Sequence, residues 1–128
     1  MSREIKFRAW DKLDGLFRKI LKAYFTIQGK VYKVALFDEA GPPLIRYIDD
    51  IELMQYTGIK DKRRIEIYEG DVIQYKGMFV IEWDQYFCRF HRKSLTIKSN
   101  GICQVFPLCE IEEKEVIGNI HENPELLK

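Results

Sequence analysis

Short runs in which apolar and polar residues alternate fill most of this 128-residue sequence, and turn-forming residues separate them. Near the N-terminus, Ile5, Phe7 and Ala9 alternate with charged residues, which is the period of a half-buried strand. Further runs rich in β-branched and aromatic residues follow at 16–21, 23–28, 31–37, 53–57, 65–68, 72–75, 78–83, 87–92, 95–98, 102–108 and 116–120. So many short strands with turn signals between them predict an all-β barrel or sandwich.

The strongest break in this pattern is Gly41-Pro42-Pro43, because Gly and Pro both interrupt strands and helices. Composition does not change across it, so we expect one domain over residues 1–128 with a hinge near 38–50. Residues 50–120 are then predicted to form a small SH3-like or related partly open barrel, and residues 1–40 to add β-hairpins. Gly29-Lys30 suits a two-residue type II′ turn in one of those hairpins.

Little helix is expected. Residues 110–115 can make one helical turn, and Asn123 followed by Pro124 resembles a helix N-cap with Pro at the first helical position.

The composition favours a protein of a reducing cytoplasm. Residues 1–6 carry charges where a signal peptide needs an apolar stretch, and no apolar run is long enough to span a bilayer. The odd number of cysteines (Cys88, Cys103 and Cys109) favours free thiols. Lys plus Arg total 21 and Asp plus Glu total 20, a smaller positive balance than proteins that live by binding phosphates usually show.

Three long and unusual segments read REIKFRAWD at 3–11, LMQYTGIKDK at 53–62 with EIYEGDV at 66–72, and VIGNIHENPEL at 116–126. They resemble the YopX family of small phage and prophage proteins, and they span nearly the whole chain. The resemblance implies a β-rich fold with a barrel-like part, a cytoplasmic location in a bacterial host, chiefly a Gram-positive one, and no established function or site residues. Relatives commonly place Asn-Gly where this chain has Arg63-Arg64, which leaves the turn type open and makes the tip more basic.

The most motif-like feature inside these segments is Tyr68-Glu69-Gly70-Asp71-Val72. Gly permits a positive φ and Asp can accept hydrogen bonds from nearby backbone N–H groups. We interpret this segment as a compact corner before a strand rather than as a ligand site.

Neither a metal site nor a catalytic site is indicated. The three cysteines with His91 contain the right atoms for a zinc site, but Cys88 and His91 are three apart and face opposite sides of a strand. His91 and His121 are the only histidines available as a general base, and no paired-carboxylate spacing or phosphate-binding loop accompanies them. We assign no catalytic residue, metal or cofactor, and an enzyme stays an alternative.

Two basic segments indicate a nucleic-acid-binding barrel as another alternative. They contain Lys60, Lys62, Arg63 and Arg64 in the first, and Arg89, Arg92 and Lys93 with His91 in the second, interleaved with Phe87 and Phe90. This hypothesis gains if both segments meet on one uninterrupted face.

Protein binding uses the near-neutral charge and the aromatic content best, through exposed aromatic anchors or open strand edges. Candidate anchors are Trp10, Tyr24, Tyr32, Tyr56 and Tyr86. The sequence thus predicts a non-enzymatic phage or prophage accessory protein that binds a host or phage protein, ahead of nucleic acid, and leaves the oligomeric state open.

Overall fold

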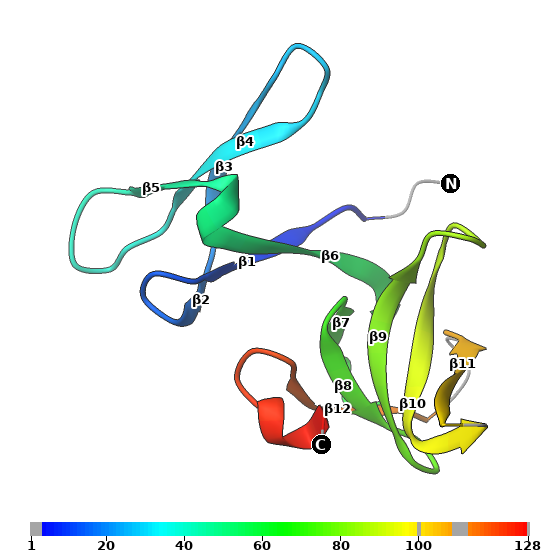
Figure 1. Ribbon diagram of the computed structural model, residues 1–128. Coiled ribbons are helices and arrows are strands. Elements are labelled where there is room, and N and C mark those ends of the chain that lie inside the picture. The colour runs from blue at the N-terminus through cyan, green and yellow to red at the C-terminus, as the bar shows by residue number, and fades with distance from the viewer. Residues whose placement is uncertain (1–3, 100, 109–112, 128) are drawn as a thin grey trace. The chain divides into compact units, whose positions relative to one another are not determined.

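The structure is a computed structural model that describes residues 4–99, 101–108 and 113–127 (Figure 1). The chain divides into two compact units. Residues 6–55 are called the N-terminal unit. The described residues among 4–5 and 56–127 are called the C-terminal unit. Strand β6 (Ile51–Lys60) passes from one to the other, between Gln55 and Tyr56. The segment 38–50, which the sequence marks as a hinge, lies within the N-terminal unit.

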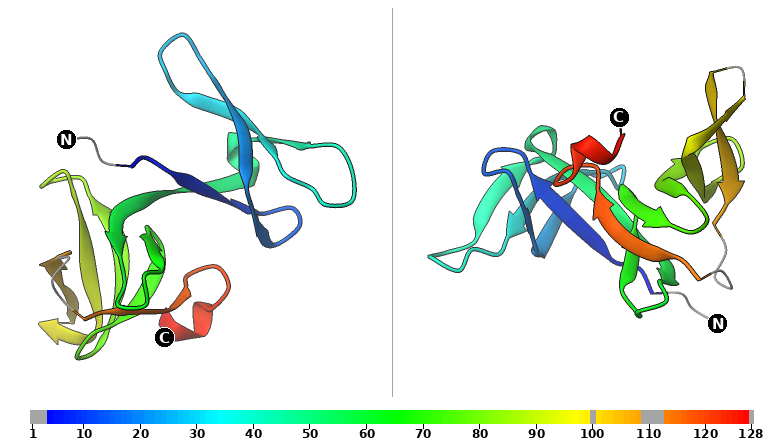
Figure 2. Two further views of the ribbon diagram at one scale, coloured as in Figure 1. Left: turned by 180° about the vertical axis from the view of Figure 1, so that it is seen from behind. Right: turned by 90° about the horizontal axis from the view of Figure 1, so that it is seen from below.

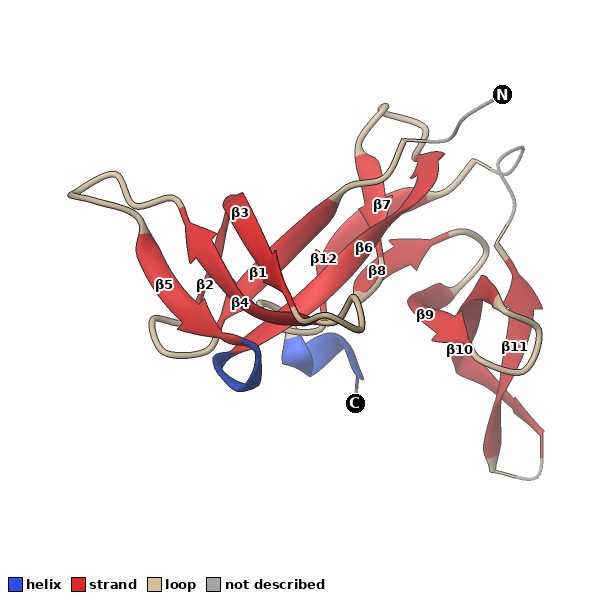
Figure 3. Ribbon diagram, turned by 90° about the horizontal axis from the view of Figure 1, so that it is seen from above, coloured by secondary structure: helices blue, strands red, loops and turns tan. Residues whose placement is uncertain are grey.

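The N-terminal unit contains five strands and the first half of β6. These strands are β1 (Phe7–Asp11), β2 (Leu16–Arg18), β3 (Ile20–Phe25), β4 (Val31–Leu36) and β5 (Leu44–Tyr47), followed by a 3-10 turn, η1 (Ile48–Asp50). β3, β4 and β5 form an antiparallel three-stranded sheet with β4 in the centre (Figure 3), while β1 pairs with β2 and β6. Its core cluster consists of the buried apolar residues Ala9, Val34, Leu36 and Ile51.

The C-terminal unit is built on an antiparallel five-stranded sheet in the order β11-β10-β9-β8-β12, which curls around its core (Figures 1 and 2). Its elements are β7 (Glu66–Tyr68), β8 (Asp71–Gln74), β9 (Met78–Asp84), β10 (Arg89–Ser99), β11 (Ile102–Pro107), β12 (Glu115–Asn119) and the 3-10 turn η2 (Pro124–Leu127). The core contains Ile67, Ile73, Phe79 and Ile81. β7 pairs with the second half of β6.

The predicted all-β class is confirmed, and the curled sheet is the predicted barrel-like part. The described residues contain no α-helix, only the two 3-10 turns, one of which begins at Pro124 as expected. None of these helical segments is long and apolar enough to cross a membrane. Of the helical turn expected at 110–115, residues 110–112 lie outside the described residues, and Glu115 begins β12.

The predicted type II′ turn at Gly29-Lys30 is wrong. The backbone N–H of Thr26 donates to the carbonyl oxygen of Lys30, so the chain reverses over residues 26–30. The hydroxyl of Thr26 also accepts a hydrogen bond from the N–H of Lys30. These side-chain and backbone bonds favour the longer loop, with Gly29 at its φ of 85°.

Candidate functional site

The first predicted basic segment forms the turn between β6 and β7, and carboxylates neutralise part of it. Lys62 Nζ lies 3.5 Å from Glu115 Oε2, and Arg63 Nη2 lies 3.5 Å from Glu115 Oε1. Arg63 also donates to the carbonyl oxygen of Val116. Lys60 pairs across the strands with Glu66. Lys62 and Arg63 therefore fasten the turn to β12 and lose much of their attraction for a phosphate.

The second predicted basic segment lies on β10, and its most promising cation is not on the surface. Arg92 is 9% exposed, and its guanidinium packs over the rings of Phe79, Tyr75 and Phe106 at 4.8, 5.5 and 5.6 Å. Lys93 Nζ forms a 3.0 Å ion pair with Glu82. Arg89 is exposed over the ring of Phe87.

The sheet order places the two basic segments apart. The turn at residues 60–64 is bonded to β12, whereas Arg89, Arg92 and Lys93 belong to β10, and strands β8 and β9 lie between these two strands. The two strands are therefore not neighbours in the sheet, and the hypothesis that both basic segments share one nucleic-acid-binding face stays a prediction.

His91 is held between two carboxylates on the β9–β10 hairpin. Its Nε2 lies 3.1 Å from Glu82 Oε1 and its Nδ1 lies 3.4 Å from Asp84 Oδ2. Burial acts to raise the pKa of Glu82, but its bonds with His91 and Lys93 outweigh this, and the pKa lies below its ordinary value. Nε2 thus forms a hydrogen bond within the hairpin, whereas Nδ1 is buried beside Asp84 and has no hydrogen-bond partner among the described residues. No group of three metal-ligating side chains occurs in the described residues; Cys88 is exposed and Cys109 lies outside them.

The Tyr68–Val72 segment forms the predicted corner. Gly70 has a φ of 86°, and Asp71 Oδ2 accepts a hydrogen bond from the backbone N–H of Tyr68. The carbonyl oxygen of Gly70 accepts from Ile120, so the corner also holds the chain after β12.

A buried carboxylate organises the N-terminal unit. Asp11 is fully buried, and its two oxygens accept hydrogen bonds of 3.0 Å from the Nε atoms of Arg18 and Arg46. Both arginines also reach Asp14. Burial acts to raise the pKa of Asp11, but the bonds from Arg46, Arg18 and the N–H of Leu13 outweigh it and lower the pKa.

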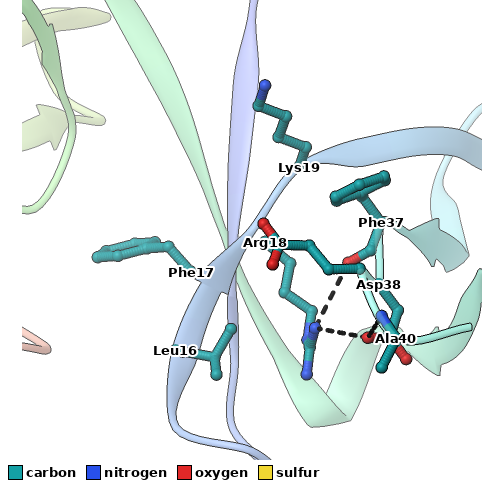
Figure 4. A pocket seen from close by; sticks show the side chains of 8 residues that line it. Leu16, Phe17, Arg18, Lys19, Phe37, Asp38 and Ala40 are labelled. Atoms are coloured by element: carbon teal, nitrogen blue, oxygen red, sulfur yellow. Dashed lines mark hydrogen bonds and ion pairs between the residues drawn. The ribbon is translucent and has the colours of Figure 1, made fainter.

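An open pocket of about 510 Å³ lies beside this network (Figure 4). Its lining residues are Leu16, Phe17, Arg18, Lys19, Phe37, Asp38, Glu39 and Ala40. The guanidinium of Arg18 already contacts Asp11, Asp14, Asp38 and the carbonyl oxygen of Phe37, so every one of its nitrogens is engaged. The arginine in this pocket holds the fold together and has no nitrogen left for an anionic ligand.

The outer face of the β3–β4–β5 sheet carries a different group of side chains. The strand register places Tyr24, Lys33 and Tyr47 in one row and Lys22, Ala35 and Ile45 in the next. Partners across an antiparallel sheet share a face, and the opposite face holds the core residues Val34 and Leu36. Tyr32 occupies the bulge beside the first row. We call Lys22, Tyr24, Tyr32, Lys33, Ile45 and Tyr47 the Tyr–Lys face.

The Tyr–Lys face combines cations with aromatic rings. It is half-buried at Tyr24 and Lys33 and exposed at its other members. Tyr47 is 57% exposed and Ile45 is 43% exposed. The Lys33 ammonium lies 4.7 Å from the ring centroid of Tyr24 and 5.8 Å from that of Tyr32. Lys22 lies 4.9 Å from the Tyr24 centroid. The rings hold both ammonium groups on this face without cancelling their charge.

Acidic residues are missing from this part of the chain. Residues 15–37 contain five basic residues (Arg18, Lys19, Lys22, Lys30 and Lys33) but no Asp or Glu. Among the described residues no carboxylate forms an ion pair with Lys22, Lys30 or Lys33. This contrasts with Lys62 and Lys93, which both have carboxylate partners.

Sequence reasoning missed the Tyr–Lys face. The sequence predicts Tyr24 and Tyr32 as candidate anchors, but it does not predict β5. The cross-strand row of Tyr24, Lys33 and Tyr47 could therefore not be inferred from the sequence. The available signal was the acid-free stretch from residue 15 to residue 37. Of the other candidate anchors, Tyr86 is 86% exposed and Tyr56 is buried.

The sequence and the fold are both similar to those of known proteins. A family described as YopX protein matches residues 6–128. The chain belongs to the YopX family. It is also similar to the crystal structure of protein EF1440 from Enterococcus faecalis, with a TM-score of 0.68 and 26% sequence identity over 99% of this chain and 100% of that one. No functionally curated protein matches the chain. Membership of the YopX family confirms the resemblance seen in the three sequence segments.

Proposed function

We propose that the protein is a non-enzymatic nucleic-acid-binding module that acts through the Tyr–Lys face. The observation that carries this proposal is the presence of Lys22 and Lys33 on one sheet face, in contact with tyrosine rings and without carboxylate partners in the part of the chain that the structure describes. Cations of this kind attract phosphates, and aromatic rings beside them offer surfaces for bases. The family resemblance supports a role as a phage or prophage accessory protein in the cytoplasm of a bacterial host.

The near-neutral net charge of the whole chain does not oppose this proposal. Charge acts over about 10 Å at ordinary ionic strength, so the local balance around a face matters more than the total. Many of the acidic residues are engaged elsewhere, for example Asp11 with two arginines and Glu115 with Lys62 and Arg63.

An electrophoretic mobility shift experiment with labelled single-stranded and double-stranded oligonucleotides tests this function. The double variant Lys22→Gln/Lys33→Gln is expected to lose most of the binding at low salt. The matched control is Lys62→Gln/Lys93→Gln, which removes the same charge from the two segments marked by the sequence and is expected to bind like the wild type. If only the control variant loses binding, the nucleic-acid-binding site lies in those two basic segments and not on the Tyr–Lys face. No shift with the wild-type protein would reject the proposed function.

A second candidate function is protein binding through the β9–β10 turn. Tyr86 and Phe87 are 86% and 61% exposed, and their rings stack edge to face with centroids 4.8 Å apart. Exposed aromatic pairs are frequent anchors in protein interfaces. In an affinity capture from nuclease-treated host lysate, a specific partner that Tyr86→Ala/Phe87→Ala no longer captures would support this candidate.

A further inference from the structure

We propose that the Tyr–Lys face binds single-stranded nucleic acid in preference to duplex, with bases stacked on Tyr24 and Tyr47 and the phosphate backbone held by Lys33 between them. This inference rests on the proposed function and names the form of nucleic acid that fits the face.

The spacing of the two rings favours an unstacked strand. Tyr24 and Tyr47 lie on the two outer strands of the sheet, each paired in register with Lys33 on the central strand. Two strand spacings separate their backbones by about 10 Å. Successive bases in a duplex are only about 3.4 Å apart and their faces are covered by neighbouring bases. Only a strand whose bases are separated can place one base on each ring.

The position of Lys33 suits a phosphate between two stacked bases. Its ammonium already lies against Tyr24 and Tyr32, on the same face and in the same row as Tyr47. A phosphate that links bases on the two tyrosines must pass over the central strand, where Lys33 is located. Lys22 lies beside Tyr24 and adds a second cation along that path.

The apolar members of the face agree with this choice. Ile45 is 43% exposed and lies two residues from Tyr47 on the same face of β5. Apolar and aromatic groups contact the flat faces of bases, and because every base has such a face, this kind of contact does not depend on base identity. A face of this composition is expected to bind single strands with little sequence preference.

Fluorescence anisotropy with a labelled mixed-sequence 20-nucleotide single strand and the corresponding duplex provides the test. The wild-type protein is expected to bind the single strand more tightly at low salt. Tyr47→Ala is expected to weaken single-strand binding by roughly tenfold, as the loss of one base stack does, while Tyr47→Phe keeps the ring and the affinity. Tyr86→Ala, which removes a more exposed tyrosine outside the face, is the matched control and should bind like the wild type.

The salt dependence separates this inference from the proposed function. Lys33→Gln is expected to reduce the slope of log K against log salt by about 0.7 for the single strand. Equal affinity for duplex and single strand, or an unchanged affinity in Tyr47→Ala, would overturn the single-strand inference. The proposed nucleic-acid binding would still stand in that case if Lys33→Gln weakens the binding of the oligonucleotides. Absence of binding to both oligonucleotides would remove both proposals. Far-ultraviolet circular dichroism of each variant verifies that the fold is retained.

Discussion

Oδ2 of Asp61 accepts a hydrogen bond of 3.0 Å from the backbone N–H of Val116, 55 residues further along the chain. Its Oδ1 accepts two more, from the N–H groups of Arg63 at 2.8 Å and Ile65 at 2.9 Å. The residue is 6% exposed. One carboxylate therefore closes the turn after β6 and fastens β12 beside it, which joins two of the segments that carry the family resemblance.

Replacement of Asp61 by Asn is expected to lower the free energy of unfolding by about 2 kcal/mol. An amide has one oxygen and an NH₂ group, so it cannot accept hydrogen bonds on both sides as Asp61 does with Val116 and with the turn. Urea unfolding followed by circular dichroism measures the change. Asp49→Asn, an exposed aspartate in η1, serves as control and should stay within about 0.5 kcal/mol of the wild type.

The same carboxylate predicts acid sensitivity. Burial acts to raise the pKa of Asp61, but the backbone hydrogen bonds from Val116, Ile65 and Arg63 outweigh it, so the folded-state pKa lies below 3.8. In the unfolded chain this group takes up its proton near its ordinary pKa, before the folded protein does. The resulting stability is present above about pH 4 and is lost as the pH falls through the folded-state pKa.

Melting temperatures measured between pH 2 and pH 6 test this sign. The wild-type protein is expected to lose stability steeply below pH 4, and Asp61→Asn to lose less over the same interval because its side chain does not titrate. The explanation fails if both proteins follow parallel curves. Asp11, whose pKa is also lowered, remains in both proteins and contributes the same background.

The strands of this fold were predictable where a local pattern specifies them, and the site was not. Residues 78–83 are a run rich in β-branched and aromatic residues, so β9 could be predicted from them alone. β5 has only four residues after two prolines, and its position depends on pairing with β4. A strand so short has little periodicity of its own, and its existence depends on tertiary contacts.

Charge was the least predictable property, because partners lie far apart in sequence. Lys62 and Arg63 form an evident basic cluster, yet both meet Glu115, more than fifty residues away. Arginine is usually exposed, but Arg92 is buried and its guanidinium packs over aromatic rings. Lys33 stands alone in the sequence and becomes part of a cationic face only when β3 and β5 flank it.

Gly118 in β12 has no room for a side chain. A Cβ atom at this position would lie 2.5 Å from Oδ1 of Asn123 and 3.0 Å from Cδ1 of Leu126. That Asn123 oxygen accepts a hydrogen bond from the N–H of Asn119, so it cannot move away without losing the bond. Gly118→Ala is expected to destabilise the protein by about 1–3 kcal/mol in thermal unfolding.

The matched control for this substitution is Gly41→Ala. A Cβ atom there meets nothing within 4 Å, and the residue does not have a positive φ. The same chemical change should therefore be neutral or slightly stabilising at Gly41. Similar losses at both glycines would show that the close approach to Asn123 is not the cause.

Asp11→Asn is expected to destabilise the N-terminal unit by roughly 3 kcal/mol, because it leaves Arg18 and Arg46 facing a neutral amide in a buried site. Amide hydrogen exchange should show faster opening of β1 and β4 than in the wild type. Asp38→Asn is the control, since its contact with Arg18 is longer, at 3.9 Å, and the residue is partly exposed. Equal effects of both substitutions would contradict the central role of Asp11.

Arg64 adopts the left-handed backbone region, with a φ of 67°. A side chain in this region costs about 1 kcal/mol, because its Cβ crowds the following carbonyl oxygen. Arg64→Gly is therefore expected to stabilise the C-terminal unit by about 0.5 kcal/mol in urea unfolding, after the greater entropy of glycine in the unfolded chain is subtracted. Arg63→Gly should destabilise it, because Arg63 has no positive φ and its side chain bonds to Val116 and Glu115. If Arg64→Gly loses stability as Arg63→Gly does, the Arg64 side chain contributes more than its backbone strain costs.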